Sequence, residues 1–264
     1  MSSLASSGLT IPSASSINSS SDDIKTLTVA GSGVLVPVVY GQYRVPAKIL
    51  NVIRDAENRN MMLIQCLWAM GCTGISSFLW SDDDMPTGSS VVSYLGYQTA
   101  PDASMVAAFT AEGLSYTDVL PGYAYSVVKM PIGQFSGQLS LSALIHGRAV
   151  YDPRKDSTAG GSGSHRLGDI LTHEYSDNPS LAYADWATNK VFGGNETMDW
   201  QSVATAANAN DELVSGEKRR LIGIALDTAT DIPSMSETLR AYAGCWVIPT
   251  GSGLKMLPDV ASTA

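Results

Sequence analysis

Short apolar runs separated by turn residues fill the first half of the chain and predict a series of β-strands. In the segment 137–147, apolar side chains recur at every second position, which is the period of a strand with one buried face. Comparable runs occupy 34–41, 44–53, 61–70, 76–80, 91–97 and 122–130. The run 61–70 is apolar on both faces, which fits a buried strand or a short helix, and the flanking turn residues favour a strand. Strands at intervals of roughly ten residues are typical of a barrel or a sandwich.

The second half of the chain changes to a helical pattern. The segment 176–194 contains Asn178 followed by Pro179; an asparagine can cap a helix, and a proline fits its first position. We expect this helix to end at one of the two glycines 193–194. Trp186 lies off the main apolar stripe, so burial on more than one side of the helix is expected.

Two further helices, a strand and a hairpin complete this half. A helix capped by Asp199 is expected over 199–216, and a helix over 234–244 is expected to open with a capping box of Ser234 and Glu237. The remaining elements are a strand over 219–226 and a hairpin that turns at 249–253. The order helix–helix–strand–helix–hairpin predicts an α+β unit.

These patterns divide the chain into four parts. The serine-rich segment 1–23 is expected to be a mobile arm, because it has neither the basic start nor the apolar centre of a signal peptide. A β-rich, barrel-like domain is expected over 24–154. The Gly/Ser segment 155–168 is predicted to be mobile, or ordered only against a neighbour, and 169–264 is the α+β domain. The predicted fold class is therefore α+β, with a β-rich barrel-like domain followed by, or carrying, an α+β domain.

Composition indicates a surface that is partly covered by neighbours. Hydrophobic residues make up 44% and charged residues only 16% of the 264 residues, against about a quarter charged in a typical soluble protein. The formal charge of −9 disfavours sequence-specific binding of nucleic acid, which needs a basic surface. The negative charge fits the wall of a conduit, which would repel DNA. In the alternative interpretation, the charge only keeps the protein soluble. No apolar run of about 18 residues is present, so no membrane span is expected.

No residue pattern predicts an active site, a metal site or a cofactor. The acidic run 82–84 lacks the spacing of a calcium loop, and the three histidines lack the spacing of zinc ligands. Glu112, Glu174 and Asp185 are acids of the kind that hydrolyse glycosides, but nothing in the sequence singles them out. The cysteines are expected to be reduced and buried, because their odd number and spacing match no disulfide or zinc motif.

An ordered set of motifs resembles one family. The segment GYAYSVVKMPIGQFSGQLSLSALIHGRAVYDPR at 122–154 is followed by YSDNPSLAYADW at 175–186. A helix that opens with DW and runs to DELV comes next, then a strand, a helix ending in YAG and a hairpin ending in LPD, while VYGQYRVPAKIL at 39–50 matches an N-terminal strand pair. In this order the motifs resemble the tail tip attachment proteins of lambda-like siphophages, also called host-specificity or central tail hub proteins, which have relatives in gene transfer agents. The likeness extends over roughly 34–259.

The resemblance implies a structural virion protein at the tail tip, with no enzymatic activity and no cofactor. It implies a homotrimeric hub of pseudo-sixfold symmetry around the channel that the tape measure protein and DNA traverse. The expected partners are further copies of the chain, the distal tail ring, the tape measure protein and a fibre or receptor-binding protein. Family members are usually much longer, so receptor recognition is expected to lie in another protein, or the chain is a shortened hub.

The resemblance also places an ordered junction where the β domain ends. The predicted interface or domain-junction residues are Tyr151, Asp152, Pro153, Arg154, Asn178, Pro179 and Trp186. Asp152 and Arg154 are expected to pair, either within the chain or across a subunit boundary. In the alternative interpretation, Pro153 only turns the chain and Arg154 is solvated.

Two other functions stay open at this point. The chain can be a tail-associated cell-wall hydrolase module, an interpretation that rests on the acidic run and the scattered acids named above. It can also be the adaptor or nozzle of a short-tailed particle, built on the same hub fold with a different symmetry and different neighbours.

Overall fold

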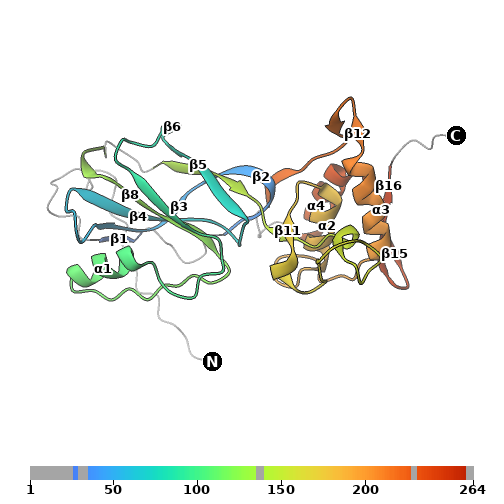
Figure 1. Ribbon diagram of the computed structural model, residues 1–264, viewed down its shortest axis with the longest axis horizontal. Helices are drawn as coiled ribbons and strands as arrows, with labels where there is room; N and C mark the ends of the chain where they lie inside the picture. Colours follow the sequence, from blue (N-terminus) through green and yellow to red (C-terminus); the bar gives the residue numbers. More distant parts are fainter. Residues whose placement is uncertain (1–25, 29–34, 135–139, 227–230, 260–264) are drawn as a thin grey trace.

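The computed structural model describes residues 26–28, 35–134, 140–226 and 231–259. They form two lobes that lie side by side along the longest axis of the molecule (Figure 1). One lobe is built from β-sheets, and the other holds most of the helices together with a β-hairpin. The predicted α+β class is confirmed.

Two antiparallel sheets, each of five described strands, pack face to face in the first lobe. One sheet has the order β1 (Thr26–Thr28), β3 (Lys48–Arg54), β4 (Met61–Ala69), β8 (Ala124–Pro131), β7 (Ser90–Tyr94). The other has the order β14 (Gly223–Leu226), β2 (Val38–Pro46), β9 (Leu141–His146), β5 (Gly74–Trp80), β6 (Asp83–Asp84). Both sheets are open in the part of the chain described, so the lobe is a sandwich rather than a closed barrel.

Strand β4 is buried on both faces because it lies between two cores. Ile64 and Trp68 pack between the sheets with Ile145 of β9. Leu63, on the opposite face, packs against Met105 of helix α1 (Ala103–Ala111). The run 61–70 is therefore a strand, as predicted, and its continuous apolar character reflects burial on both sides.

Helix α1 is not among the predicted elements. It lies beside the first sheet (Figure 1) and buries Met105 and Phe109 there. The carboxylate of Asp102 caps the helix by accepting a hydrogen bond from the N–H of Met105 at 2.9 Å. The capping aspartate is a signal that the sequence carries, but burial against the sheet supplies the stability of so short a helix.

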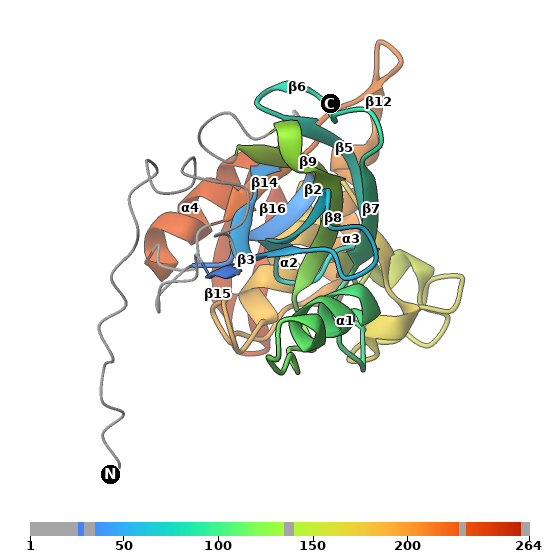
Figure 2. The same ribbon diagram turned by 90° about the vertical axis from the view of Figure 1, so that its left-hand side faces the viewer.

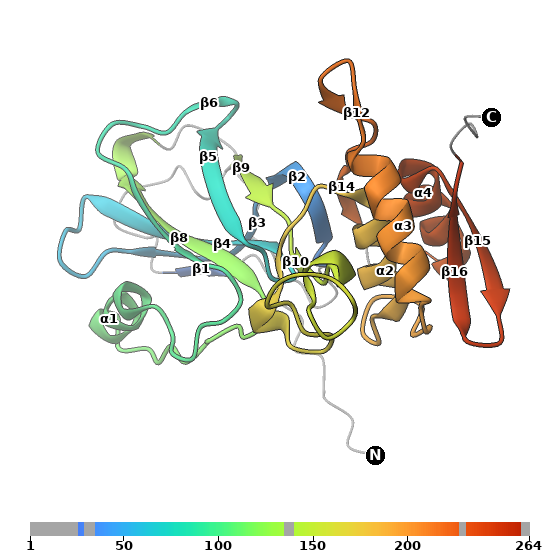
Figure 3. The ribbon, with the colours of Figure 1, turned by 45° about the vertical axis from the view of Figure 1, so that its right-hand side comes forward.

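Strand β2 belongs to both lobes, and Figure 3 shows it at their boundary. Residues 38–41 pair with β14, and residues 42–46 pair with β9. Tyr40 lies in the core of the helical lobe, whereas Val45 lies in the core of the sandwich. Where the pairing changes, Gly41 has a φ of 65°, a left-handed conformation that glycine adopts without strain.

The second lobe, called here the helical lobe, contains three helices and a hairpin. Its elements are α2 (Pro179–Thr188), α3 (Trp200–Asp211), α4 (Ile232–Ala243), β15 (Cys245–Thr250) and β16 (Gly253–Pro258). The predicted order of helices, strand and hairpin is confirmed, although strand β14 joins the sandwich sheet instead of the helical lobe. None of the helices described is long and apolar enough to cross a membrane.

The predicted N-caps of α2 and α3 are confirmed. The side-chain oxygen of Asn178 accepts hydrogen bonds from the N–H groups of Ser180 and Leu181 at 3.0 and 3.4 Å, and Pro179 occupies the first turn. Asp199 caps α3 in the same way. Caps of this kind satisfy N–H groups that have no partner inside the helix.

The predicted end of the first helix is wrong. Helix α2 ends at Thr188, because Asn189 turns out of the helical conformation and its side chain accepts hydrogen bonds from the next residues. Gly193 and Gly194 then pass close to the end of the helix, where the N–H of Gly194 donates to the carbonyl of Trp186 at 3.3 Å. The two glycines lack a Cβ atom, so the chain can pass this close to the helix; they do not end it.

Two further helix boundaries differ from the prediction. Helix α4 is capped by Asp231, whose carboxylate accepts hydrogen bonds from the N–H and hydroxyl of Ser234, so the capping box of Ser234 and Glu237 is wrong. Helix α3 ends at Asp211, and the chain then forms a small hairpin of β12 (Leu213–Val214) and β13 (Glu217–Lys218).

The Gly/Ser segment 155–168 is ordered by contacts within its own chain, which corrects the expectation of a mobile segment. It follows the 3-10 turn η3 (Pro153–Lys155) and precedes a second one, η4 (Ile170–Thr172), with the strands β10 (Ala149–Val150) and β11 (Glu174–Tyr175) pairing on either side. The carboxylate of Asp156 accepts hydrogen bonds from Thr158, Tyr151 and Arg166. Gly161 passes so close to η3 that a Cβ atom would lie 2.4 Å from a backbone oxygen.

Gly41→Ala is expected to destabilise the protein by about 3 kcal/mol, because the new Cβ would lie 1.7 Å from the carbonyl oxygen of Ile222. Urea denaturation measures this loss. Gly251→Ala is the matched control, since a Cβ there meets nothing within 4 Å, and it should cost less than about 1 kcal/mol. Equal stability of the two variants would contradict the account of β2.

Candidate functional site

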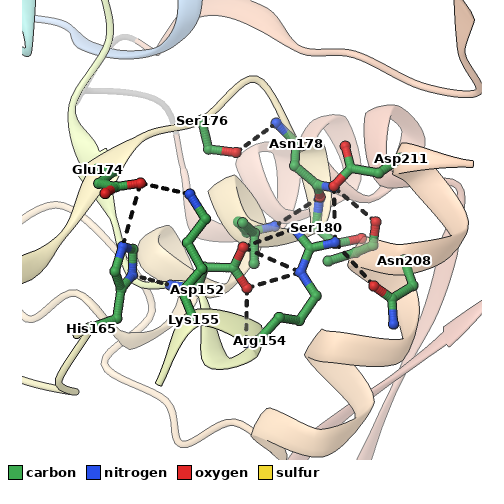
Figure 4. Close-up of polar contacts among 12 residues, drawn as sticks. Asp152, Arg154, Lys155, His165, Glu174, Ser176, Asn178, Ser180, Asn208 and Asp211 are labelled. Carbon is green, nitrogen blue, oxygen red and sulfur yellow. Dashed lines mark hydrogen bonds and ion pairs between the residues drawn. The ribbon is translucent and has the colours of Figure 1, made fainter. Parts of the chain in front are cut away.

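Two of the predicted junction residues, Asp152 and Arg154, belong to a polar cluster (Figure 4). We call it the junction cluster; its members are Asp152, Arg154, Lys155, His165, Glu174 and Asp211. They come from the segment after β10, from η3, from the Gly/Ser segment, from β11 and from the end of α3. Together with neighbouring residues they line a cavity of about 280 Å³.

Arg154 holds the junction cluster together. Its Nε and Nη2 donate to the two carboxylate oxygens of Asp152 at 2.9 and 2.8 Å. Its Nη1 donates to Asp211 at 2.9 Å and to Asn208 at 3.1 Å, both on α3. The predicted pair therefore forms within the chain, and Arg154 is not simply solvated. A guanidinium that grips two carboxylates fixes both their distance and their orientation.

Asp211 and Arg154 each favour the ionised form of the other. Burial alone would raise the pKa of Asp211, but Arg154, together with Asn178 and Lys218, outweighs it and lowers this pKa. Burial alone would lower the pKa of Arg154, but its contacts with Asp152 and Asp211 outweigh it and raise this pKa. The ion pair of Arg154 with Asp211 therefore links η3 to α3.

His165 is a buried histidine of the junction cluster. It is only 2% exposed, and its Nδ1 accepts a hydrogen bond from the N–H of Asp152 at 3.1 Å. Its Nε2 lies 3.8 Å from the carboxylate of Glu174, which itself accepts a hydrogen bond from Lys155 at 2.6 Å. Burial lowers the pKa of His165, and the nearby Glu174 offsets this only in part.

Tyr151 fixes the Gly/Ser segment to helix α3. Its hydroxyl donates to Asp156 at 2.9 Å, and its ring meets that of Trp200 edge to face, with centroids 4.9 Å apart. Burial, followed by the hydrogen bond to Asp156, raises the pKa of Tyr151, so its hydroxyl stays a donor. Pro153 is buried in the first turn of η3, where its fixed φ suits the turn.

The remaining predicted residues do not all belong to this cluster. Asn178 lies nearby and joins two helices, because it caps α2 while its amide donates to the carbonyl of Ala207 in α3 at 2.9 Å. Pro179 only starts α2. Trp186 is buried in the core of the helical lobe, 2% exposed, with its ring centroid 5.8 Å from that of Tyr183. The structure therefore brings five of the seven predicted residues to the junction region and leaves Pro179 and Trp186 in the helix and its core.

The acids considered for hydrolysis are bound to separate cations. Glu112 pairs with Arg59, Glu174 with Lys155, and Asp185 with Arg148, at 2.6, 2.6 and 2.8 Å. Glu112 lies at the end of α1 in the sandwich lobe, whereas Asp185 lies in α2. Among the residues described, no group of three or more His, Cys, Asp or Glu side chains is arranged to hold a metal ion.

A partly buried triad at the boundary between the lobes is not among the predicted interface residues. The hydroxyl of Tyr40 in β2 donates to Asp185 in α2 at 2.6 Å, and Nε of Arg148 lies 2.8 Å from the same carboxylate oxygen. The guanidinium of Arg148 also lies over the ring of Phe192, 5.1 Å from its centroid. Burial and then Asp185 raise the pKa of Tyr40. These partners are far apart in the sequence, so only the folded chain reveals them.

The three cysteines are free and buried, as the sequence predicts. Burial raises the pKa of Cys66, and it raises the pKa of Cys72 to about 12. Thiols of this kind are poor nucleophiles at neutral pH.

Comparisons with known proteins identify a shared fold. Neither a protein-family model nor a curated protein matches the sequence. Among solved structures, the chain is similar to one in the virion of a native gene transfer agent particle, with a TM-score of 0.51 and 16% sequence identity. The match covers 90% of this chain and 55% of that one. The chain thus spans about half the length of the protein it resembles, and shares the fold of that part.

Arg154→Met is expected to lower the free energy of unfolding by about 3 kcal/mol, because it leaves Asp152 and Asp211 without their common partner. Arg219→Met is the control, since it breaks only the exposed pair with Glu212 at 2.7 Å and should cost less than about 1 kcal/mol. Urea denaturation of both variants at neutral pH measures the difference. If Arg154→Met lowers the free energy of unfolding no more than Arg219→Met does, Arg154 does not stabilise the junction cluster.

Stability is expected to fall as the pH drops below about 6.5, the ordinary pKa of histidine. The unfolded chain takes up a proton there, whereas the lowered pKa of His165 keeps the folded chain unprotonated until a lower pH is reached. His165→Asn, whose amide oxygen can accept the same N–H, should reduce this slope, and His146→Gln in the sandwich should retain it. Urea midpoints measured between about pH 5 and 8 test this, and an unchanged slope in His165→Asn would refute it.

Proposed function

We propose that this chain is a structural protein of a phage-like virion, and that it forms the central hub of the tail tip. The observation that carries the proposal is the likeness, over 90% of the chain, to a chain in the virion of a gene transfer agent. The motif resemblance to tail hub proteins, which have relatives in gene transfer agents, agrees with it. The two arguments use different properties of the chain, namely its three-dimensional fold and the order of its sequence motifs.

The surface of the helical lobe supports a role in assembly. On the outer face of the β15–β16 hairpin, Trp246 and Leu257 lie directly across from each other and are 65% and 40% exposed. Ile248 on the same strand face is 43% exposed, while the inner face of the hairpin packs into the core. Exposed apolar patches of this kind mark surfaces that another protein covers.

The finer role is carried over from the tail hub proteins that the sequence motifs resemble. In a hub, three copies of the chain would form a ring around the channel, with the distal tail ring, the tape measure protein and a fibre or receptor-binding protein as neighbours. The formal charge of −9 suits a channel wall that DNA passes without binding. No residue of the chain is assigned a catalytic role in this proposal, because the acids of the junction cluster and of the lobe boundary serve ion pairs.

Antibody labelling and cryo-electron microscopy of purified particles test the proposal. We expect the chain in the particle, at the tip of the tail, in a ring of three copies, and we expect no clearing of peptidoglycan by the purified protein. Absence from the particle would refute a virion role. A position next to the portal would favour the adaptor or nozzle, and clearing of peptidoglycan by a protein that stays monomeric would favour the hydrolase.

A further inference from the structure

A second cavity, of about 270 Å³, opens between α2, α4 and the β15–β16 hairpin. Ile232 and Pro233 of α4 and Val247 and Leu254 of the hairpin give it largely apolar walls. It is separate from the junction cluster, with which it shares no lining residue. Figure 2 shows α4 and β15 next to each other on one side of the molecule.

Two hydrogen-bond donors of this cavity have no acceptor within the described part of the chain. Trp186 lines the cavity and is 2% exposed, yet its indole N–H has no hydrogen-bond partner there. The same holds for Nε of Arg240. None of the ion pairs formed by the described residues includes Arg240. Glu196 also lines the cavity but is exposed, and it is not paired with Arg240.

These donors define the chemistry of a ligand. A buried indole N–H normally has a hydrogen-bond partner, and a guanidinium is best matched by a carboxylate, which can accept several of its N–H groups at once. The apolar walls suit a hydrophobic side chain next to that carboxylate. The volume admits one or two side chains and not a large ligand. The cavity therefore fits an acidic residue with an apolar neighbour, presented by another polypeptide.

The chain itself carries an acidic segment where it turns from β5 into β6, called here the 82–84 turn: Asp82 lies in the turn, and Asp83 and Asp84 form β6. Asp82, Asp83 and Asp84 are exposed there and take part in no ion pair within the described residues. The flanking Trp80 and Met85 are partly buried against the core of the sandwich, so the exposed carboxylates are what this segment offers to a partner. The 82–84 turn lies in the sandwich, whereas α2, α4 and the β15–β16 hairpin, which line the cavity, lie in the helical lobe (Figures 1 and 3). A second copy of the chain can bring the two together.

We propose that the cavity beside Trp186 and Arg240 receives a carboxylate of the 82–84 turn from a second copy of this chain. The contact is head to tail, because it joins two different surfaces, and repeated contacts of this type close into a ring when the rotation allows it. This inference rests on the proposed function, since it supplies the subunit interface of the ring. Charge complementarity gives the contact its specificity.

A charge exchange tests the contact by sedimentation velocity of the full chain. Arg240→Glu, and the triple change Asp82→Asn, Asp83→Asn, Asp84→Asn, are each expected to weaken self-association by at least about tenfold. Combining Arg240→Glu with Asp82→Lys, Asp83→Lys and Asp84→Lys should restore much of it. The control Glu57→Gln, Asp118→Asn, Glu217→Gln neutralises the same number of exposed acids and should associate like the parent chain. Circular dichroism verifies folding, and Arg240→Gln replaces Arg240→Glu if the latter is misfolded.

The outcomes separate this proposal from the function on which it rests. Unchanged association in the Arg240 and the acidic variants overturns the contact and leaves the hub intact. Loss of association in the Arg240 variants alone also overturns it, because the carboxylate then comes from another segment or another protein. A parent chain that never associates, and that antibody labelling does not find in the particle, overturns the hub as well.

Discussion

Strand β2 is the element on which the rest of the structure depends, because its side chains enter the cores of both lobes. Its first half pairs with β14 and its second half with β9. Side chains on opposite faces of the strand enter two different cores, as Tyr40 and Val45 do. The lobes cannot part without exposing the buried Tyr40 and the carboxylate of Asp185, which contacts both Tyr40 and Arg148. A partly buried carboxylate that loses its partners destabilises the fold.

Local signals were sufficient to predict several elements. Asn178 before Pro179, and Asp199 before an amphipathic run, mark helix starts through hydrogen bonds within one turn. The strands of the sandwich follow from period-two patterns that burial on one face dictates. In each case the interactions that stabilise the element lie within a few residues of one another, so the sequence pattern contains them.

Contacts between distant segments account for what the sequence could not predict. Helix α1 is stable because Met105 packs under a sheet whose strands are distant in sequence. The Gly/Ser segment 155–168 looks like a flexible linker in composition, yet its glycines permit a close fold that Asp156 holds in place. The local pairing of Asp152 with Arg154 was foreseeable, whereas the second partner, Asp211 on α3, was not. The Gly193–Gly194 pair resembles a helix stop, but a close contact with the preceding helix explains it better.

The internal ion pair of Asp185 with Arg148 and the shared strand β2 link the two lobes. The most direct test of this account is hydrogen exchange measured in rising urea, with β4 reporting on the sandwich and α3 on the helical lobe. If β2 unites the lobes, the slowest amides of both segments will share one free energy of opening and one dependence on urea. Separate opening of α3 at a urea concentration that leaves β4 protected would contradict the account.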